Sequence, residues 1–145
     1  MLPLLPLRLS NLSIGAYDPK QGGSGVQQYF ADMLLDSDRN AKYFEAIYNT
    51  VRSFIVDNGR APVVLDAGCG TGFLTACALV AGAERVIAVD MDKAHIDKLE
   101  ERIGHNYMCR VTGVHIEYGS NPFAESKIRP ELQFDLLVSE LLGTF

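Results

Sequence analysis

Hydrophobic and polar positions along this chain follow two patterns, one typical of helices and one typical of strands. From residue 29 to about residue 56, apolar side chains recur at steps of three and four, which predicts one amphipathic helix or two in succession. Later apolar runs are short and nearly continuous, as in strands of a parallel sheet that are buried on both faces. These runs lie at 63–65, 85–90, 111–118 and 134–139, and segments predicted as helices lie at 72–80 and 92–103.

Strands that alternate with helices indicate right-handed crossovers and a parallel sheet. The fold class that we expect is therefore α/β, a Rossmann-like parallel sheet flanked by helices, of which these 145 residues contain the first four strands only. The length and the 48% share of hydrophobic residues suit one globular domain.

The beginning of the chain lies outside this periodic part. The stretch MLPLLPLRLS is apolar, but Pro3 and Pro6 interrupt it and it is too short to span a bilayer, so we expect no signal or transmembrane segment. The following DPKQGGSG is typical of a flexible linker. We therefore divide the chain into an N-terminal extension and linker at 1–25 and one domain at 26–145.

Composition narrows the classes of partner. Thirteen basic and 18 acidic residues give a formal charge of -5, which argues against a nucleic-acid or anionic-membrane partner and favours a cationic one. Three cysteines without C-x-x-C spacing predict neither a disulfide framework nor a zinc site, and we expect no bound metal. The three histidines, which we interpret as surface or hydrogen-bonded side chains, are His95, His105 and His115.

The stretch VVLDAGCGTGFLTACALVAGAERVIAVD, residues 63–90, has the length of one βαβ unit with a glycine loop at its first turn. Gly68 and Gly70 allow a ligand to approach the backbone closely, and the helix that begins near Gly72 offers free N–H groups. A dinucleotide fingerprint would require a third glycine where this chain has Phe73, so that match fails. No lysine follows the glycines, which excludes the usual phosphate loop of an NTPase.

Two aspartates flank this loop and indicate the charge of the ligand. Asp66 lies two residues before Gly68, where its carboxylate would repel a pyrophosphate but attract a cation. S-adenosylmethionine carries an ammonium and a sulfonium group. Asp90 follows Gly68 by 22 residues, the spacing at which an acid reaches the ribose hydroxyls of a nucleoside. Each residue alone would suit a turn or a helix cap, but together they favour an adenosylmethionine site.

Three motifs resemble one family. VLDAGCGTG resembles motif I of class I methyltransferases, and FDLLVSELLG resembles the protein arginine methyltransferases. The upstream YFADMLLDSDRNAKYFEAI is similar to the helix that covers the cofactor in that family, closest to its monomethylating branch. The resemblance covers residues 29–145 and implies that 26–145 is an S-adenosylmethionine-binding methyltransferase domain.

The resemblance also implies roles for individual residues. Arg39 would bind the carboxylate of the cofactor, although an exposed ion pair with Asp36 or Asp38 is the alternative. Ser120 or Asn121 would contact adenine, because the acid that the family pattern leads us to expect is not evident in YGSNPF. The remaining residues that we expect around the methionyl and ribose groups are Asp66, Gly68, Cys69, Gly70, Gly72, Asp90 and Met91.

Glu140 follows the fourth apolar run and is the expected catalytic residue. In the family it is the first of two glutamates that clamp the substrate guanidinium and leave the target nitrogen with a more available lone pair. For an isolated glutamate, a helix N-cap would be the alternative. The resemblance places the second glutamate and the β-barrel domain beyond Phe145, so we expect an amino-terminal fragment that is inactive alone. The exposed apolar edge of 134–139 would invite aggregation or a homodimer.

The expected function is thus an S-adenosylmethionine-dependent protein arginine N-methyltransferase that acts on arginines in basic Arg/Gly-rich protein segments. One alternative is a non-catalytic, cofactor-binding partner of such an enzyme, which regulates it or dimerises with it. Another is a small-molecule methyltransferase, which needs the glycine loop but not the SELLG strand. We expect a cytoplasmic location, with the nucleus as the alternative, while the target protein and the choice between mono- and dimethylated product stay open.

Overall fold

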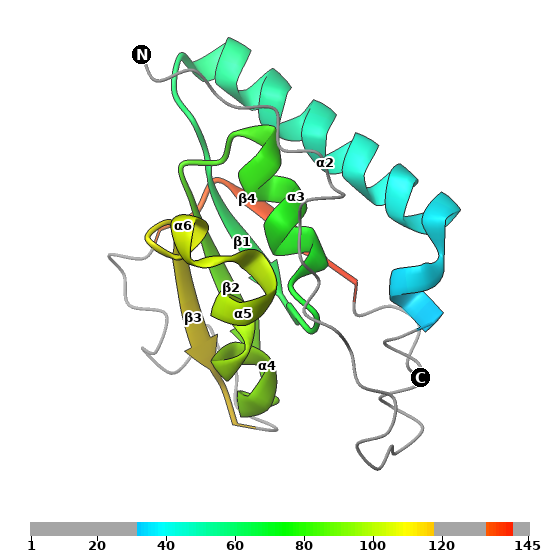
Figure 1. Cartoon of the computed structure of the whole chain (residues 1–145). Coiled ribbons are helices and arrows are strands. Elements are labelled where there is room, and N and C mark those ends of the chain that lie inside the picture. The colour runs from blue at the N-terminus through cyan, green and yellow to red at the C-terminus, as the bar shows by residue number, and fades with distance from the viewer. Residues whose placement is uncertain (1–31, 118–132, 141–145) are drawn as a thin grey trace.

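The computed structural model of this chain describes residues 32–117 and 133–140. These residues form a parallel sheet with helices packed against it (Figure 1). The elements are α2 (Ser37–Asn58), β1 (Val63–Ala67), α3 (Phe73–Ala81), β2 (Arg85–Asp90), α4 (Lys93–Asp97), α5 (Leu99–Ile103), α6 (His105–Met108), β3 (Val111–His115) and β4 (Leu136–Ser139). The proposed extension and linker at 1–25 lie outside the described residues, as do Ser120 and Asn121.

The four strands are ordered β3-β2-β1-β4, and every neighbouring pair is parallel. The chain therefore builds the sheet in one direction from β1 to β3 and then crosses to the other side of β1 to add β4. The glycine loop leaves β1 at this reversal of strand order, the place where open α/β sheets bind ligands. The predicted α/β class with a Rossmann-like parallel sheet is confirmed.

The amphipathic segment before the sheet forms two helical pieces. Residues 32–35 are helical, Asp36 interrupts them, and α2 follows. Asp36 caps α2 because its side chain accepts a 3.0 Å hydrogen bond from the Arg39 N–H. Gly59 ends the helix in a left-handed conformation with φ of 66°. No described helix is both long and apolar enough to cross a membrane.

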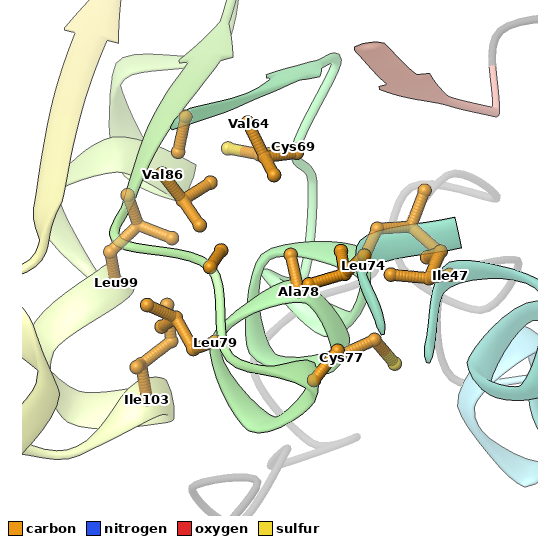
Figure 2. Packing of buried hydrophobic residues seen from close by; sticks show 14 residues of the cluster. Ile47, Val64, Cys69, Leu74, Cys77, Ala78, Leu79, Val86, Leu99 and Ile103 are labelled. Atoms are coloured by element: carbon orange, nitrogen blue, oxygen red, sulfur yellow. The ribbon is translucent and has the colours of Figure 1, made fainter. Parts of the chain in front are cut away.

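The core lies mainly on one face of the sheet. There α3 to α6 cover the strands and α2 packs on α3 (Figure 1). Figure 2 shows Leu74 of α3 beside Ile47 of α2, and Leu79 of α3 beside Ile103 of α5. A smaller cluster on the opposite face contains Leu65, Ile87 and Val89 of β1 and β2. The two clusters explain why both strands read as continuous apolar runs: each buries side chains on both faces.

Three predicted boundaries or extents were wrong. The segment predicted as one helix at 92–103 is divided into α4 and α5, because Lys98 adopts φ of -94° and ψ of 0° between them, and Gly104, with φ of 93°, ends α5 before α6. The third strand ends at His115, before the predicted residue 118, and the fourth begins at Leu136, two residues later than predicted.

Candidate active site

The glycine loop joins β1 to α3 at the carboxyl edge of the sheet. Its three alternate glycines all have positive φ angles: 77° at Gly68, 49° at Gly70 and 84° at Gly72. At Gly72, a Cβ atom would also lie 3.2 Å from Leu99 Cδ2, so only glycine suits this turn into α3. The N–H groups of Gly68 and Cys69 both donate to the Val89 carbonyl, at 2.8 and 2.9 Å, and thereby fix the loop to β2.

Asp66 lies on β1 next to this loop, and its side chain is completely buried. Its Oδ2 accepts a 2.6 Å hydrogen bond from the Thr75 hydroxyl of α3, whereas no hydrogen bond reaches Oδ1 within the described ranges. Burial raises the pKa of the Asp66 carboxyl to about 7, although the hydrogen bonds from Thr75 act in the opposite direction. A ligand that brings positive charge or a donor to Oδ1 would therefore stabilise the ionised form.

Asp90 ends β2, and the backbone holds its carboxylate firmly. Oδ2 accepts a 2.7 Å hydrogen bond from the Gly70 N–H, and Oδ1 accepts one of 2.8 Å from the Asp92 N–H. Burial alone would raise the pKa of Asp90, but hydrogen bonds from His95, Asp92 and Gly70 outweigh it and hold the pKa below its usual range. Asp90 is therefore an ionised acceptor at neutral pH, directly beside the glycine loop.

Glu140 follows β4 at the same edge of the sheet. Leu136 and Val138 of β4 pack against the helix-covered core. Glu140 follows Val138 by two residues, the spacing at which side chains of a strand share one face. Its Oε1 accepts a 2.9 Å hydrogen bond from Arg39 Nε, and Oε2 forms an ion pair with Arg39 Nη2, so the guanidinium binds both carboxylate oxygens. Both side chains are mostly buried, with 19% of Arg39 and 22% of Glu140 exposed.

The Arg39 guanidinium is fixed on its other sides by α2 itself. Nη1 donates a 2.7 Å hydrogen bond to Asn40 Oδ1, and the guanidinium lies 4.9 Å from the centre of the Tyr43 ring. The alternative of a surface ion pair with Asp36 or Asp38 is not observed, since Asp36 binds the backbone N–H of Arg39 instead. Arg39 is thus a rigid fork that connects the beginning of α2 to the end of β4, 101 residues away.

The other predicted site residues fall into two groups. Cys69 is buried inside the loop, where burial raises the pKa of its thiol, and Met91 is exposed directly after Asp90. The predicted adenine contacts, Ser120 and Asn121, are not among the described residues. Within the described part of the chain, all cysteines are free and no cluster of side chains could hold a metal ion.

Sequence reasoning missed three residues that support this edge. Thr75 binds Asp66, Arg102 of α5 donates a 2.9 Å hydrogen bond to the Gly70 carbonyl, and His95 Nδ1 lies 3.4 Å from Asp90 Oδ2. The placement of Arg102 needed the fold of α4 to α6, which no pattern predicted. The contact between His95 and Asp90 likewise depends on how α4 packs against β2. His105, by contrast, is an exposed residue paired with Glu100, as expected of a surface histidine.

A cavity of about 310 Å³ lies between the first turn of α2, the end of the glycine loop, the start of α3 and α5. Asn40, Thr71, Phe73 and Arg102 are among the residues that line it. None of Asp66, Asp90 and Glu140 lines this cavity. We therefore do not assign the cofactor to it, because the charged groups that would recognise a nucleoside with an amino-acid tail lie elsewhere.

The residues at the carboxyl edge fit S-adenosylmethionine. Asp90 offers a charged pair of acceptors to a ribose, and the buried Asp66 Oδ1 suits a cationic group. The fully bonded Gly68 and Cys69 N–H groups are not available to a phosphate, which agrees with a ligand that has none. Arg39 carries the fork that suits a carboxylate.

Comparison with known proteins agrees with this arrangement. The sequence profile of the family described as "Methyltransferase domain" matches residues 64–143, more than half of the chain. The chain is 36% identical over 119 residues to protein arginine N-methyltransferase 7 of Cricetulus longicaudatus. The aligned region covers 79% of this chain and 16% of that protein. It is also 36% identical over 119 residues to the protein of that name in Danio rerio. The chain thus spans only about a sixth of the length of these curated relatives.

Two solved structures are similar to it as well. Arabidopsis thaliana protein arginine methyltransferase 10 superimposes with a TM-score of 0.56 at 29% identity, covering 83% of this chain and 30% of that one. The Trypanosoma brucei PRMT1 enzyme-prozyme heterotetramer, solved with AdoHcy, gives a TM-score of 0.57 at 25% identity, covering 88% of this chain and 33% of that one. The chain is therefore a member of the protein arginine methyltransferase family and has its Rossmann-like class I fold.

Proposed function

We propose that this chain forms the cofactor half of an S-adenosylmethionine-dependent protein arginine N-methyltransferase. The observation that carries the proposal is the convergence of three carboxylates, Asp66, Asp90 and Glu140, on one edge of the sheet around the glycine loop. A dinucleotide enzyme or an NTPase would not require acids at all three strand ends. The membership of the family and the AdoHcy bound to the trypanosomal relative support the choice of cofactor.

Asp90 would accept the ribose hydroxyls, and Asp66 would face the positive charge of the methionyl part. When bound, S-adenosylmethionine supplies an electrophilic methyl group on its sulfonium. The protein's own contribution is positioning, for which oriented reactions gain on the order of 7 to 11 kcal/mol. The backbone bonds that fix the glycine loop and Asp90 suit that task.

Glu140 would hold the substrate guanidinium. An arginine side chain stays protonated in proteins, so its nitrogens are poor nucleophiles. A carboxylate that binds two of its N–H groups draws positive charge toward them and leaves the third nitrogen more nucleophilic. The ion pair between Arg39 and Glu140 supports this role, because both oxygens of the Glu140 carboxylate are in contact with the guanidinium of Arg39.

Arg39 would serve both the cofactor and Glu140. Its fork contacts Glu140, and the same planar group suits the carboxylate of the methionyl tail. An arginine shared between the two would keep Glu140 at the correct distance from the methyl donor. Basic Arg/Gly-rich segments are the proposed protein substrate, and the acidic charge of the chain supports that proposal.

Calorimetry and methyl transfer together test the proposal. The 145-residue chain should bind S-adenosylmethionine or S-adenosylhomocysteine and should not prefer NAD. For catalysis, the chain would replace the matching residues of a full-length protein arginine N-methyltransferase 7 relative, and radiolabelled methyl transfer to an Arg/Gly-rich peptide would be measured. Binding of NAD in preference to the adenosylmethionine pair would contradict the proposal for the loop.

A non-catalytic partner remains the second candidate. The observation in its favour is that one similar structure is an assembly of an enzyme with a prozyme. In that case the chimera would bind S-adenosylhomocysteine but transfer no methyl group, and addition of the chain to an active relative would change that relative's rate. A small-molecule methyltransferase would instead leave Arg/Gly-rich peptides unmodified while methylating a low-molecular-weight acceptor.

A further inference from the structure

We infer that Arg102 of α5 is a positioning residue for the cofactor. It holds Gly70 in the orientation in which the glycine loop and Asp90 receive the ribose, and it acts through the backbone of Gly70. This inference rests on the proposed function, because it requires a nucleoside cofactor at the loop.

Gly70 is held between two side chains of opposite charge. Its N–H donates a 2.7 Å hydrogen bond to Asp90 Oδ2, and its carbonyl accepts a 2.9 Å hydrogen bond from Arg102 Nη1. Gly70 is buried and has a left-handed φ of 49°, so its polar groups lie outside the regular bonding of β1 and α3. A buried backbone group without a partner costs about as much free energy as a lost hydrogen bond. Each charged side chain therefore satisfies one polar group of Gly70.

A glycine at this position needs such bonds to keep one conformation. Because glycine has no Cβ, the sterics of Gly70 leave a wide range of backbone angles open. Without a partner for its carbonyl, Gly70 could rotate and withdraw its N–H from Asp90 Oδ2. The carboxylate of Asp90 would then lose its bond to the loop. The placement of the ribose acceptor thus depends on Arg102, although the two side chains bind different groups of Gly70.

The short helix α5 supports the glycine loop at a second point as well. Leu99 and Ile103 are both buried, and a Cβ atom at Gly72 would lie 3.2 Å from Leu99 Cδ2 and 3.6 Å from Ile103 Cδ1. Apolar side chains of α5 therefore lie beneath Gly72, while Arg102 of the same helix binds Gly70. These contacts fix the position from which the guanidinium donates.

The guanidinium of Arg102 is not engaged by a carboxylate. Burial lowers the pKa of Arg102, and negative charges nearby, including Asp90 and Asp92, act in the opposite direction. Within the described ranges no acid binds this guanidinium directly, whereas Arg39 and Arg60 each bind both oxygens of a carboxylate. Arg102 is therefore a half-buried charged donor whose bond goes to a carbonyl, and such charge-assisted bonds are stronger than neutral ones.

Three variants test this role in the 145-residue chain. Arg102→Met keeps an apolar stem but has no donor, and Arg102→Lys keeps a charged donor. Arg110→Met is the matched control, because Arg110 also donates to backbone carbonyls, those of Ala83 and Glu84, in the turn between α3 and β2. Calorimetry measures the affinity for S-adenosylhomocysteine. The amide proton resonance of Gly70, measured by NMR without ligand, reports the bond to Asp90 independently of binding.

Arg102→Met should bind S-adenosylhomocysteine about threefold to tenfold more weakly than the wild type, the effect of about one hydrogen bond. Its Gly70 amide resonance should move upfield as the bond to Asp90 weakens. Arg102→Lys and Arg110→Met should stay within about twofold of the wild-type affinity and keep the resonance, because each retains a charged donor to Gly70.

A double-mutant cycle with Asp90→Ala tests the route through Gly70. Two residues that act through one shared partner are not additive. Adding Arg102→Met to Asp90→Ala should therefore cost less than about a further twofold in affinity, because the bond that Arg102 supports is already absent. The same fold loss in both backgrounds would overturn the inference.

Other results separate this inference from the proposed function. If the wild type binds S-adenosylhomocysteine and folded Arg102→Met binds it equally well, or loses no more than Arg110→Met, the inference is overturned while the cofactor assignment stands. If Arg102→Met does not fold, Arg102→Gln replaces it and should bind more weakly than Arg102→Lys; equal or tighter binding would overturn the inference. If the folded wild type binds no S-adenosylhomocysteine, the proposed function fails and this inference fails with it.

Discussion

Acidic side chains lie at one edge of the sheet in two regions, the carboxyl ends of β1 and β2 and the carboxyl end of β4. Different interactions hold the acids of the two regions in place. Asp66 and Asp90 are positioned by groups inside one βαβ unit: Thr75, the loop N–H groups and the first turn after β2. Glu140 is positioned by one side chain, Arg39, which lies 101 residues away. The first arrangement is local and mostly backbone, whereas the second is a long-range ion pair.

This difference indicates what each region is suited to do. A loop whose N–H and carbonyl groups are bonded on both sides is a rigid receptor and suits a cofactor that must be held in one orientation. An ion pair can exchange partners, because another guanidinium or another carboxylate can replace either side. The β4 end is therefore suited to a reacting group that enters and leaves.

The largest expected effect is at the β4 end. In the chimera with a full-length relative, Glu140→Gln should lower methyl transfer by about 100-fold or more, the usual cost of losing one preorganised charge contact. Affinity for S-adenosylhomocysteine should stay nearly unchanged, because Arg39 remains available. Radiolabelled transfer and calorimetry measure the two. Glu45→Gln, the same change at an exposed position of α2, is the control, and full activity of Glu140→Gln would refute the carboxylate mechanism.

At the β1 end, the buried carboxylate should make stability fall as pH rises. The pKa of Asp66 is raised from 3.8 to about 7 in the folded chain. Between these values the unfolded chain loses the proton and the folded chain keeps it, so the free energy of unfolding should fall by about 1.4 kcal/mol per pH unit and level off above about pH 7. Asp66→Asn should remove this slope in urea unfolding measured at several pH values.

The exposed Asp97 provides a matched control for that slope. Asp97→Asn changes the same functional group on α4, where Asp97 is 57% exposed and paired with Lys93. It should leave the pH dependence between about pH 4 and pH 7 as in the wild type. A slope that persists in Asp66→Asn would mean that some other group titrates in this range, and the contrast between the two strand ends would be weakened.

The contrast also explains how far the sequence could predict this molecule. The order of strands and the glycine loop follow from local patterns, because apolar runs and glycines act within a few residues of their position. The division of 92–103 into α4 and α5 could not be predicted, because it depends on the turn at Lys98 and on how Leu99 packs beneath Gly72. The composition of residues 92–103 would suit one continuous helix equally well, so it does not reveal the division.

For the site, the acids were predictable and their partners were not. Asp66, Asp90 and Glu140 each follow an apolar run, which a single sequence displays. Arg39 was associated with the site only through family resemblance, and its bond to Glu140 requires the fold. His95 and Arg102 were missed because their contacts with Asp90 and Gly70 arise from the packing of short helices against strand ends.

A smaller effect is expected from Asp90. Asp90→Ala should weaken binding of S-adenosylhomocysteine by about 1 to 3 kcal/mol, the range for hydrogen bonds to a charged group, because it removes the ribose acceptors. The same change also frees the Gly70 N–H, so part of the loss would come from a looser loop. Lys98→Ala on the neighbouring turn is the control and should change affinity little. Equal losses in the two variants, measured by calorimetry, would indicate general destabilisation.

The smallest effect should come from the opposite end of β4, where a second arginine pair provides the sharpest comparison with Glu140. Arg60 donates to both oxygens of Asp135, at 2.9 and 2.6 Å, and the Val63 N–H donates to the same carboxylate at 2.8 Å. The hydrogen bond from Arg60, together with that from Val63, outweighs the opposing effect of burial and holds the pKa of Asp135 below its usual range. This ion pair is more exposed than the one between Arg39 and Glu140, with 55% of the Arg60 side chain accessible, so solvent screens it.

Asp135→Asn should therefore lower the Tm by no more than about a few degrees, because the amide oxygen still accepts the Val63 N–H and only a screened ion pair is lost. Since the pKa of Asp135 is depressed in the folded chain, its stabilising effect is present above about pH 4 and is lost as pH falls below that value. Thermal unfolding of both proteins at about pH 3 and pH 7 would measure the difference, which should be smaller at the lower pH, because the effect begins to be lost below the pKa of the unfolded chain. Methyl transfer by the chimera should be unchanged. A loss of transfer as large as that of Glu140→Gln would mean that Glu140 acts through the placement of β4 and not through its own charge.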